Sequence, residues 1–174
     1  MTAKAEKRAE APAGFVVESR SPHETKSWGR RLASLLEGGE IIGFIGDLGA
    51  GKTVFIKGLA TGLQLREEDV LSPTFTMIQE HRGRLTLHHI DLYRLETADL
   101  DDLGLREYLF SEGVAAVEWF ERLREGPELE FLSVKIDFAD ANARRIEFSA
   151  KDVRHAAIVA RLMRRFERSR GKLL

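Results

Sequence analysis

The amino-acid sequence predicts one α/β domain, with a mixed β-sheet that has a parallel core, antiparallel hairpin strands and flanking helices. The segment 40–63 indicates the parallel core, because a short apolar strand runs directly into a Gly-rich turn and then a helix. Two strand-like runs around Gly83 predict an antiparallel hairpin. The alternating segments 132–139 and 144–150 predict a second antiparallel pair, at an edge of the protein.

The N-terminal half is expected to hold a strand, two helices and a long connection. Residues 15–19 have the composition of a strand, and Ser21, Pro22 and Glu24 form a capping box that starts a helix. This helix should end at the two glycines 38–39. Its apolar face consists of Trp28, Leu32, Leu35 and Leu36. A second helix is expected from about residue 52 to 63, followed by a long irregular connection over 65–76.

The C-terminal half adds a helical stretch around Gly104, a buried strand over 113–119 and a basic amphipathic helix from about Lys151 to Ser169. One face of the last helix should pack on the domain and the opposite face should lie in water. The packing face is Val159, Leu162, Met163 and Phe166, and the water-facing side is Arg154, Arg161, Arg165 and Arg168.

Length and composition limit the classes of protein that fit. The chain has 174 residues, a formal net charge of −1 and no cysteine, so we expect one domain over 15–174 with neither disulfides nor thiolate metal sites. Residues 1–14 have the composition of a flexible tail and lack the apolar stretch of a secretory signal. No apolar run approaches the length of a membrane span, and we expect a cytoplasmic protein.

The segment GDLGAGKT, residues 46–53, fits the phosphate-binding motif G-x-x-x-x-G-K-[ST]. Its glycines allow a tight turn whose N–H groups contact phosphate oxygens at a helix N-terminus. Lys52 is predicted to reach the β- and γ-phosphates, and Thr53 to bind Mg²⁺. The sheet is therefore expected to be P-loop NTPase-like, with ATP and Mg²⁺ as cofactors. The predicted nucleotide contacts are Gly46, Asp47, Leu48, Gly49, Ala50, Gly51, Lys52, Thr53 and Val54.

A Mg²⁺–nucleotide site usually needs an acidic residue at the end of a nearby strand. Asp91 and Glu118 each end a predicted strand, at the edge of an α/β sheet where ligands bind. One would bind Mg²⁺, directly or through water, and the other would orient the attacking water. The alternative for each is a surface or helix-capping acid.

Three further positions near these acids have two interpretations each. Thr74, in the long connection, either senses the γ-phosphate or belongs to a turn built by Ser72-Pro73. His88 and His89 should point to opposite faces of their strand, which favours a packed or hydrogen-bonded histidine over a metal site. Trp119 should face away from Glu118, in the core or against a nucleotide or partner.

Five motifs, in this order and at these distances, are similar to those of the TsaE family, the small ATPases of bacterial tRNA threonylcarbamoyladenosine biosynthesis. They are GDLGAGKT, SPTFT, HHIDLYRL, LGLREYL and VEW, and the resemblance runs from about residue 21 to 150. It implies a P-loop α/β fold and a protein that hydrolyses ATP slowly alone. It also implies two partners, a TsaD-like threonylcarbamoyl transferase and a TsaB-like protein, whose complex is reset by ATP between turnovers.

The resemblance also implies roles for single residues. Lys52 and Thr53 would bind ATP and Mg²⁺, and Thr74 would lie in a switch-like loop. Asp91 would be the Walker-B-like acid and Glu118 an acid of the Mg²⁺ site. An arginine on a late strand would lie near the nucleotide, with Arg144 as our placement and Arg145 as its rival, and Ser21 would lie near the base.

The basic C-terminal helix lies outside this resemblance. Residues 151–174 hold eight Lys and Arg, at 151, 154, 161, 164, 165, 168, 170 and 172, against acids at 152 and 167, which is a net charge of +6. The helix is either a solvated surface or a contact to tRNA or to an acidic partner. The alternative function to an accessory ATPase is a small-molecule P-loop kinase, which the lack of a recognisable lid disfavours. A nucleotide-gated binding module without useful catalysis is a third interpretation.

Overall fold

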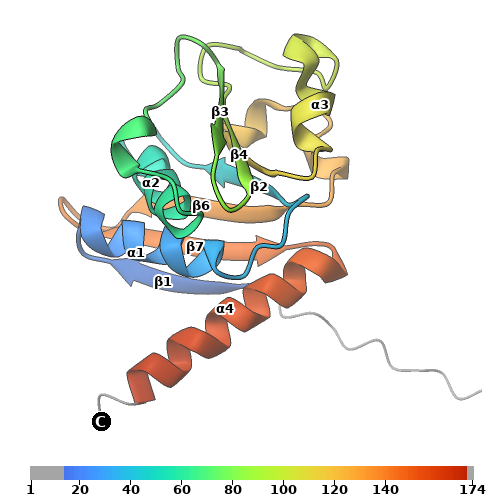
Figure 1. Ribbon diagram of the computed structural model, residues 1–174. Coiled ribbons are helices and arrows are strands. Elements are labelled where there is room, and N and C mark those ends of the chain that lie inside the picture. The colour runs from blue at the N-terminus through green and yellow to red at the C-terminus, as the bar shows by residue number, and fades with distance from the viewer. Residues whose placement is uncertain (1–13, 172–174) are drawn as a thin grey trace, which may run out of the picture.

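The computed structural model describes residues 14–171, so the predicted tail 1–14 lies outside the described residues except for Gly14. Seven strands form one sheet in the order β1-β7-β6-β2-β5-β4-β3 (Figure 1). The strands β6, β2, β5 and β4 are parallel to one another, while β1, β7 and β3 pair antiparallel. The predicted mixed sheet with a parallel core is confirmed.

The elements follow the expected order along the chain. The strands are β1 (Phe15–Ser19), β2 (Ile41–Ile45), β3 (Ile78–Arg82), β4 (Thr86–Asp91), β5 (Val114–Glu118), β6 (Leu132–Phe138) and β7 (Arg144–Ala150). The helices are α1 (Pro22–Ala33), α2 (Lys52–Gly62), α3 (Leu105–Leu109) and α4 (Val153–Gly171). Short 3₁₀ turns η1–η4 lie at Glu67–Asp69, Asp102–Gly104, Phe120–Arg122 and Gly126–Glu128.

The two faces of the sheet are covered differently. Helices α1, α2 and α4 share one hydrophobic cluster with alternate residues of the central strands, such as Phe44, Val114 and Ala116. The opposite face packs a smaller cluster around Ile41, Ala115 and the short helix α3. The alternation of β2 and β5 between the two clusters is the period-two pattern of strands buried on both sides. Among the described residues, no helix is both long and apolar enough to span a membrane.

Three predicted details differ from the structure. Helix α1 ends at Ala33, although Leu35 and Leu36 are still buried in the following turn. The stretch around Gly104 is not one continuous helix, because a 3₁₀ turn at Asp102–Gly104 precedes α3 and Leu103 and Gly104 take left-handed backbone conformations. Strand β7 is not at the edge, since β1 pairs on its outer side.

Arg154 is exposed, as expected, and it also contacts the domain. Its guanidinium donates to the carbonyl oxygens of Gly38 and Gly39 and pairs at 3.2 Å with the buried carboxylate of Glu40. The first turn of α4 is therefore tied to the loop between α1 and β2. Further along, Phe166 packs against Trp28 of α1, with tilted rings and centroids 4.9 Å apart, as the predicted packing face requires.

Candidate nucleotide site

The phosphate-binding segment forms the loop between β2 and α2. Gly46 has φ 147° and packs so tightly that a Cβ would lie 2.2 Å from the carbonyl oxygen of Ile136, so only glycine fits there. At Gly51, which precedes the first residue of α2, a Cβ would meet no atom within 4 Å. The loop is thus closed against the sheet at its start and open at the helix N-terminus, which is the shape that a phosphate group requires.

The Lys52 ammonium lies inside this loop. It donates to the carbonyl oxygens of Gly46 and Asp47 at 2.7 and 2.9 Å, and lies 3.9 Å from the centre of the Trp119 ring. Burial lowers the pKa of Lys52, against the opposing pull of Glu118 and other carboxylates. Within residues 14–171 no carboxylate forms an ion pair with this amine. A buried cation held only by carbonyls and a ring suits an incoming phosphate.

Glu118 connects the first turn of α2 to the strands. The hydroxyl of Thr53 donates to Glu118 Oε1 at 2.8 Å, and Nε2 of His89 lies 2.8 Å from the same oxygen. All three side chains lie on the α2 side of the sheet, and Glu118 is only 3% exposed. A hydroxyl beside a carboxylate is the kind of oxygen donor set that Mg²⁺ prefers when phosphates and water complete its shell. No group of three or more metal-ligating side chains occurs in the described part of the chain.

Asp91 lies next to Glu118 in the β4–β5 register and holds the long connection. Its Oδ2 accepts hydrogen bonds from the hydroxyls of Ser72 at 3.0 Å and Thr74 at 2.7 Å, while Oδ1 accepts from the amide of Tyr93. Thr74 therefore belongs both to a turn with Ser72 and to the edge of the loop cavity. The carboxylate of Asp91 fixes that segment in place.

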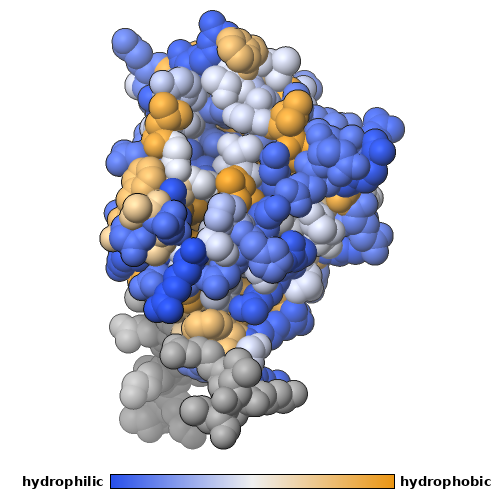
Figure 2. Space-filling model, turned by 90° about the vertical axis from the view of Figure 1, so that its left-hand side faces the viewer, coloured by the Kyte–Doolittle hydropathy of each residue, from blue (hydrophilic) through white to orange (hydrophobic). Residues whose placement is uncertain are grey.

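These groups surround one hollow of about 250 Å³. Its lining residues are Leu48, Gly49, Gly51, Lys52, Thr53, Val54, Ser72, Thr74, Asp91, Tyr93, Glu118 and Trp119. The hollow opens at the carboxyl ends of the parallel strands, on the side of the molecule that Figure 2 presents. Hydrophobic residues form separate patches among hydrophilic ones on that face (Figure 2). The predicted loop, both acids and Thr74 are thus brought together.

Arg144 and Ser21 lie on the other side of the loop. The Nε of Arg144 donates to the Ala50 carbonyl at 2.9 Å, and a smaller hollow of about 80 Å³ includes Arg144, Ser21 and Gly51. Arg145 points to the opposite face, where it pairs with Glu147 and Asp137. Of the two predicted arginines, Arg144 is the one that contacts the phosphate loop. Ser21 caps α1 by accepting from the amide of Glu24, which confirms the predicted helix start.

Trp119 packs partly against the smaller core cluster, and its ring also contacts Lys52. Its backbone is left-handed, with φ 59°, so the alternation of β5 ends there and the indole turns to Lys52. The guanidinium of Arg122 also lies over two aromatic rings. It is 4.8 Å from the centre of the Trp119 ring and 5.3 Å from the centre of the Tyr93 ring. Trp119 thus combines core packing with a place in the lining of the hollow.

The sequence did not lead us to three residues around this hollow. Ser72 was considered only as part of a turn, His89 was not matched to Glu118, and Arg122 was not considered. His89 could have been found, because it precedes Asp91 by two residues on one strand and so shares its face. The predicted opposite orientation of His88 is confirmed, since its ring packs edge-on to Tyr108 of α3. Nothing in the local sequence marks the stacking of Arg122.

Comparison with known proteins extends these observations. A sequence model of the family described as "Threonylcarbamoyl adenosine biosynthesis protein TsaE" matches residues 19–146. The chain belongs to the TsaE family. The TsaE protein of Treponema pallidum is 45% identical over 127 residues, which are 71% of this chain and 93% of that protein. The TsaE protein of Bacillus subtilis is 41% identical over 145 residues, 83% of this chain and 90% of that protein.

The fold of this TsaE family member also matches a solved structure. The crystal structure of YdiB from Bacillus subtilis superimposes with a TM-score of 0.72 and 34% sequence identity, covering 87% of this chain and 95% of that chain. The family match ends at residue 146, within β7, so helix α4 lies beyond it.

Proposed function

We propose that this TsaE family member binds and slowly hydrolyses ATP with Mg²⁺, as an accessory factor for repeated threonylcarbamoyl transfer to tRNA adenosine. The observation that carries the proposal is the convergence of Lys52, Thr53, Asp91, Glu118 and Thr74 on one hollow. Family membership supplies the pathway, since the relatives are named for tRNA threonylcarbamoyladenosine biosynthesis.

Each residue has a task that its position supports. The loop amides and Lys52 would bind the phosphates, with the amine exchanging the carbonyls of Gly46 and Asp47 for phosphate oxygens. Thr53 and Glu118 would hold Mg²⁺, with Asp91 as a ligand through water. A bound Mg²⁺ would neutralise the charge that develops on the phosphates during transfer. The carboxylate that does not bind Mg²⁺ directly would orient the attacking water by accepting a hydrogen bond from it.

The Thr74 segment would report the state of the nucleotide to partners. Thr74 is fixed to Asp91, so any group that competes for this carboxylate would release the segment. The same segment exposes two apolar side chains, Leu71 and Phe75, the latter 86% exposed. Exposed apolar groups on a segment that responds to the nucleotide suit a protein partner. We assign these partners as TsaD-like and TsaB-like proteins of the cytoplasm.

Helix α4 would add a contact to tRNA. Arg161, Arg164, Arg165 and Arg168 lie at i, i+3, i+4 and i+7, so they occupy one side of the helix, where they line a shallow hollow of about 170 Å³. Arg161 is 3.8 Å from Glu37 and Arg165 donates to Ser34, whereas Arg164 and Arg168 have no ion pair with any described residue. Clustered guanidinium groups repel one another and favour a polyanion that lies across them.

Reconstitution tests the proposed function. Threonylcarbamoyl transfer should be followed over many turnovers with the two partner proteins, with and without this chain, using ATP or a non-hydrolysable analogue. We expect this chain and hydrolysable ATP to be needed only beyond the first turnover. If purified protein binds no ATP, or if phosphate appears on a metabolite instead of in solution, the proposal is wrong, and the second result would identify a kinase.

A further inference from the structure

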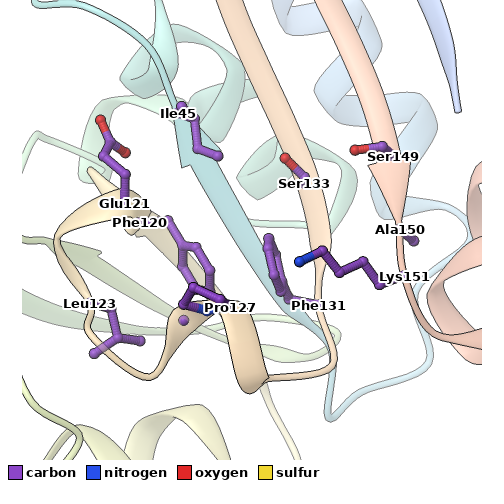
Figure 3. Close-up of a pocket in the computed structure, with 11 residues that line it drawn as sticks. Ile45, Phe120, Glu121, Leu123, Pro127, Phe131, Ser133, Ser149, Ala150 and Lys151 are labelled. Carbon is purple, nitrogen blue, oxygen red and sulfur yellow. The ribbon is translucent and has the colours of Figure 1, made fainter. Parts of the chain in front are cut away.

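An apolar hollow of about 380 Å³ lies on the face of the sheet opposite α2 (Figure 3). Its floor and one wall are apolar, from Phe120, Leu123, Pro127 and Phe131. The rings of Phe120 and Phe131 face each other with centroids 4.2 Å apart. The volume falls within the usual range for small-molecule sites, about 300–1,000 Å³.

The opposite wall is polar and carries a cation. Ser133 and Ser149 are direct partners in the β6–β7 register, and their hydroxyls point to the same side as the amine of Lys151 (Figure 3). The Lys151 side chain is exposed but extends toward the Phe131 ring (Figure 3). Glu121 points away from it, and within residues 14–171 Lys151 has no ion pair. The wall thus offers one ammonium and two hydroxyls to a ligand.

Two covalent connections join this hollow to the nucleotide site. Ile45 lines the hollow and is followed directly by Gly46, the first residue of the phosphate loop. Phe120 lines it and follows Trp119, whose ring contacts Lys52. Phe120 is held in place because it fills the space above Gly43 of β2, where a Cβ would lie 2.6 Å from its ring. A displacement of Phe120 would therefore be transmitted to Trp119.

We propose that this hollow is a second ligand site, for a small carboxylate with an aromatic or branched aliphatic body, whose occupancy changes nucleotide affinity. The apolar body would pack between Phe120 and Phe131, and the carboxylate would accept hydrogen bonds from Lys151 and the two serines. Because both ligands bias the 119–120 segment, each changes the affinity for the other by the same factor. The site goes beyond the proposed ATPase and does not require it.

Binding of 3-phenylpropionate, compared with the neutral 3-phenylpropanol and with acetate, tests the site. Titrations followed by ¹H–¹⁵N NMR on the full chain without nucleotide should show the carboxylate shifting amides of 119–133 and 149–151. We expect the alcohol to bind about fivefold more weakly, as one exposed ion pair allows. Acetate should show no saturation because it lacks the apolar body. Equal affinity of acid and alcohol would refute the anion-binding wall, and shifts confined to other segments would refute the site.

Variants separate the site from a general effect of charge. Lys151→Met should lower carboxylate affinity about fivefold while leaving alcohol binding unchanged. The matched control is Lys135→Met, since Lys135 lies on the same strand as Ser133 but is paired with Asp137 at 3.2 Å. Ser149→Phe should fill the hollow and abolish binding of both probes. If Lys135→Met has the same effect as Lys151→Met, the proposal fails.

Coupling is measured by repeating the titration of 3-phenylpropionate with saturating MgATP. A changed affinity, matched by the reciprocal change in ATP affinity, supports communication through Phe120. Unchanged affinities would overturn the coupling. Should the chain bind no ATP, probe binding without nucleotide would still decide the site, so the two failures are distinguishable. If the carboxylate does not bind but the partner proteins protect the 119–133 amides, the occupant is a protein side chain and the proposal is wrong.

Discussion

The phosphate-loop edge and helix α4 use charged residues in opposite ways. At the loop edge, Lys52, Asp91 and Glu118 are each less than 5% exposed and each has fixed partners. On α4, Arg161, Arg164, Arg165 and Arg168 are exposed and make few contacts with the domain. Charge buried with fixed partners selects one geometry, whereas exposed charge provides attraction that depends on salt. Substitutions should therefore have large, local effects at the first region and small, graded effects at the second.

The largest effect is expected for Lys52→Ala. Removing the ammonium leaves the phosphates without their cation, and we expect nucleotide affinity to fall at least about a hundredfold, the usual scale for losing one partner of a buried charged hydrogen bond. Calorimetric titration with MgATP measures it. Lys57→Ala, one and a half turns along α2, is the control and should bind normally. An unchanged affinity for Lys52→Ala would show that the loop does not bind phosphate as proposed.

Glu118→Gln should separate binding from turnover. The amide keeps a hydrogen-bond acceptor for Thr53 and His89 but cannot accept a proton or hold a cation as a carboxylate does. We expect near-normal ATP binding and partner-stimulated phosphate release that is about a hundredfold slower. Single-turnover release of phosphate measures the rate. Normal turnover would remove Glu118 from the mechanism, and lost binding would give it a structural role instead.

The lowered pKa of Lys52 predicts the pH dependence of binding. In the free protein burial favours the neutral amine, whereas bound phosphate would favour the charged amine and raise its pKa again. Affinity for MgATP should therefore be highest below the pKa of the free protein and fall as pH rises through it, with proton uptake on binding. Calorimetry in buffers of different ionisation enthalpy measures the uptake. An affinity for MgATP that does not change with pH up to the ordinary pKa of lysine would contradict this prediction.

The smallest and most graded effect is expected on α4. Replacing Arg161, Arg165 and Arg168 by Gln should weaken tRNA binding uniformly across sequences, and lower the slope of log affinity against log salt by about 2–3. Filter binding at several salt concentrations measures this. Arg82→Gln with Arg106→Gln is the control, because both arginines pair with neighbouring acids elsewhere on the surface. A salt response equal to wild type would favour a solvated helix face.

Local patterns predicted most of the fold, and contacts between distant segments account for the errors. The phosphate loop, the capped start of α1 and the β3–β4 hairpin are each specified within a short segment, and each is found. The contacts of Trp119 and Arg154 were not predicted. Trp119 contacts Lys52 and Arg154 contacts Glu40, and each contact joins segments that lie far apart in the sequence. Single-segment periodicity carries no information of that kind.

The contact between Lys52 and Trp119 has a spectroscopic consequence. The chain has two tryptophans, and Trp28 packs against Phe15 and Phe166 and does not line the nucleotide hollow, so its emission should be constant. An ammonium 3.9 Å above the indole of Trp119 perturbs its excited state, and a phosphate that draws the amine away would remove that perturbation. The intrinsic fluorescence of the unlabelled protein would then follow the arrival and departure of nucleotide in real time, with a Trp119→Phe variant as the silent reference.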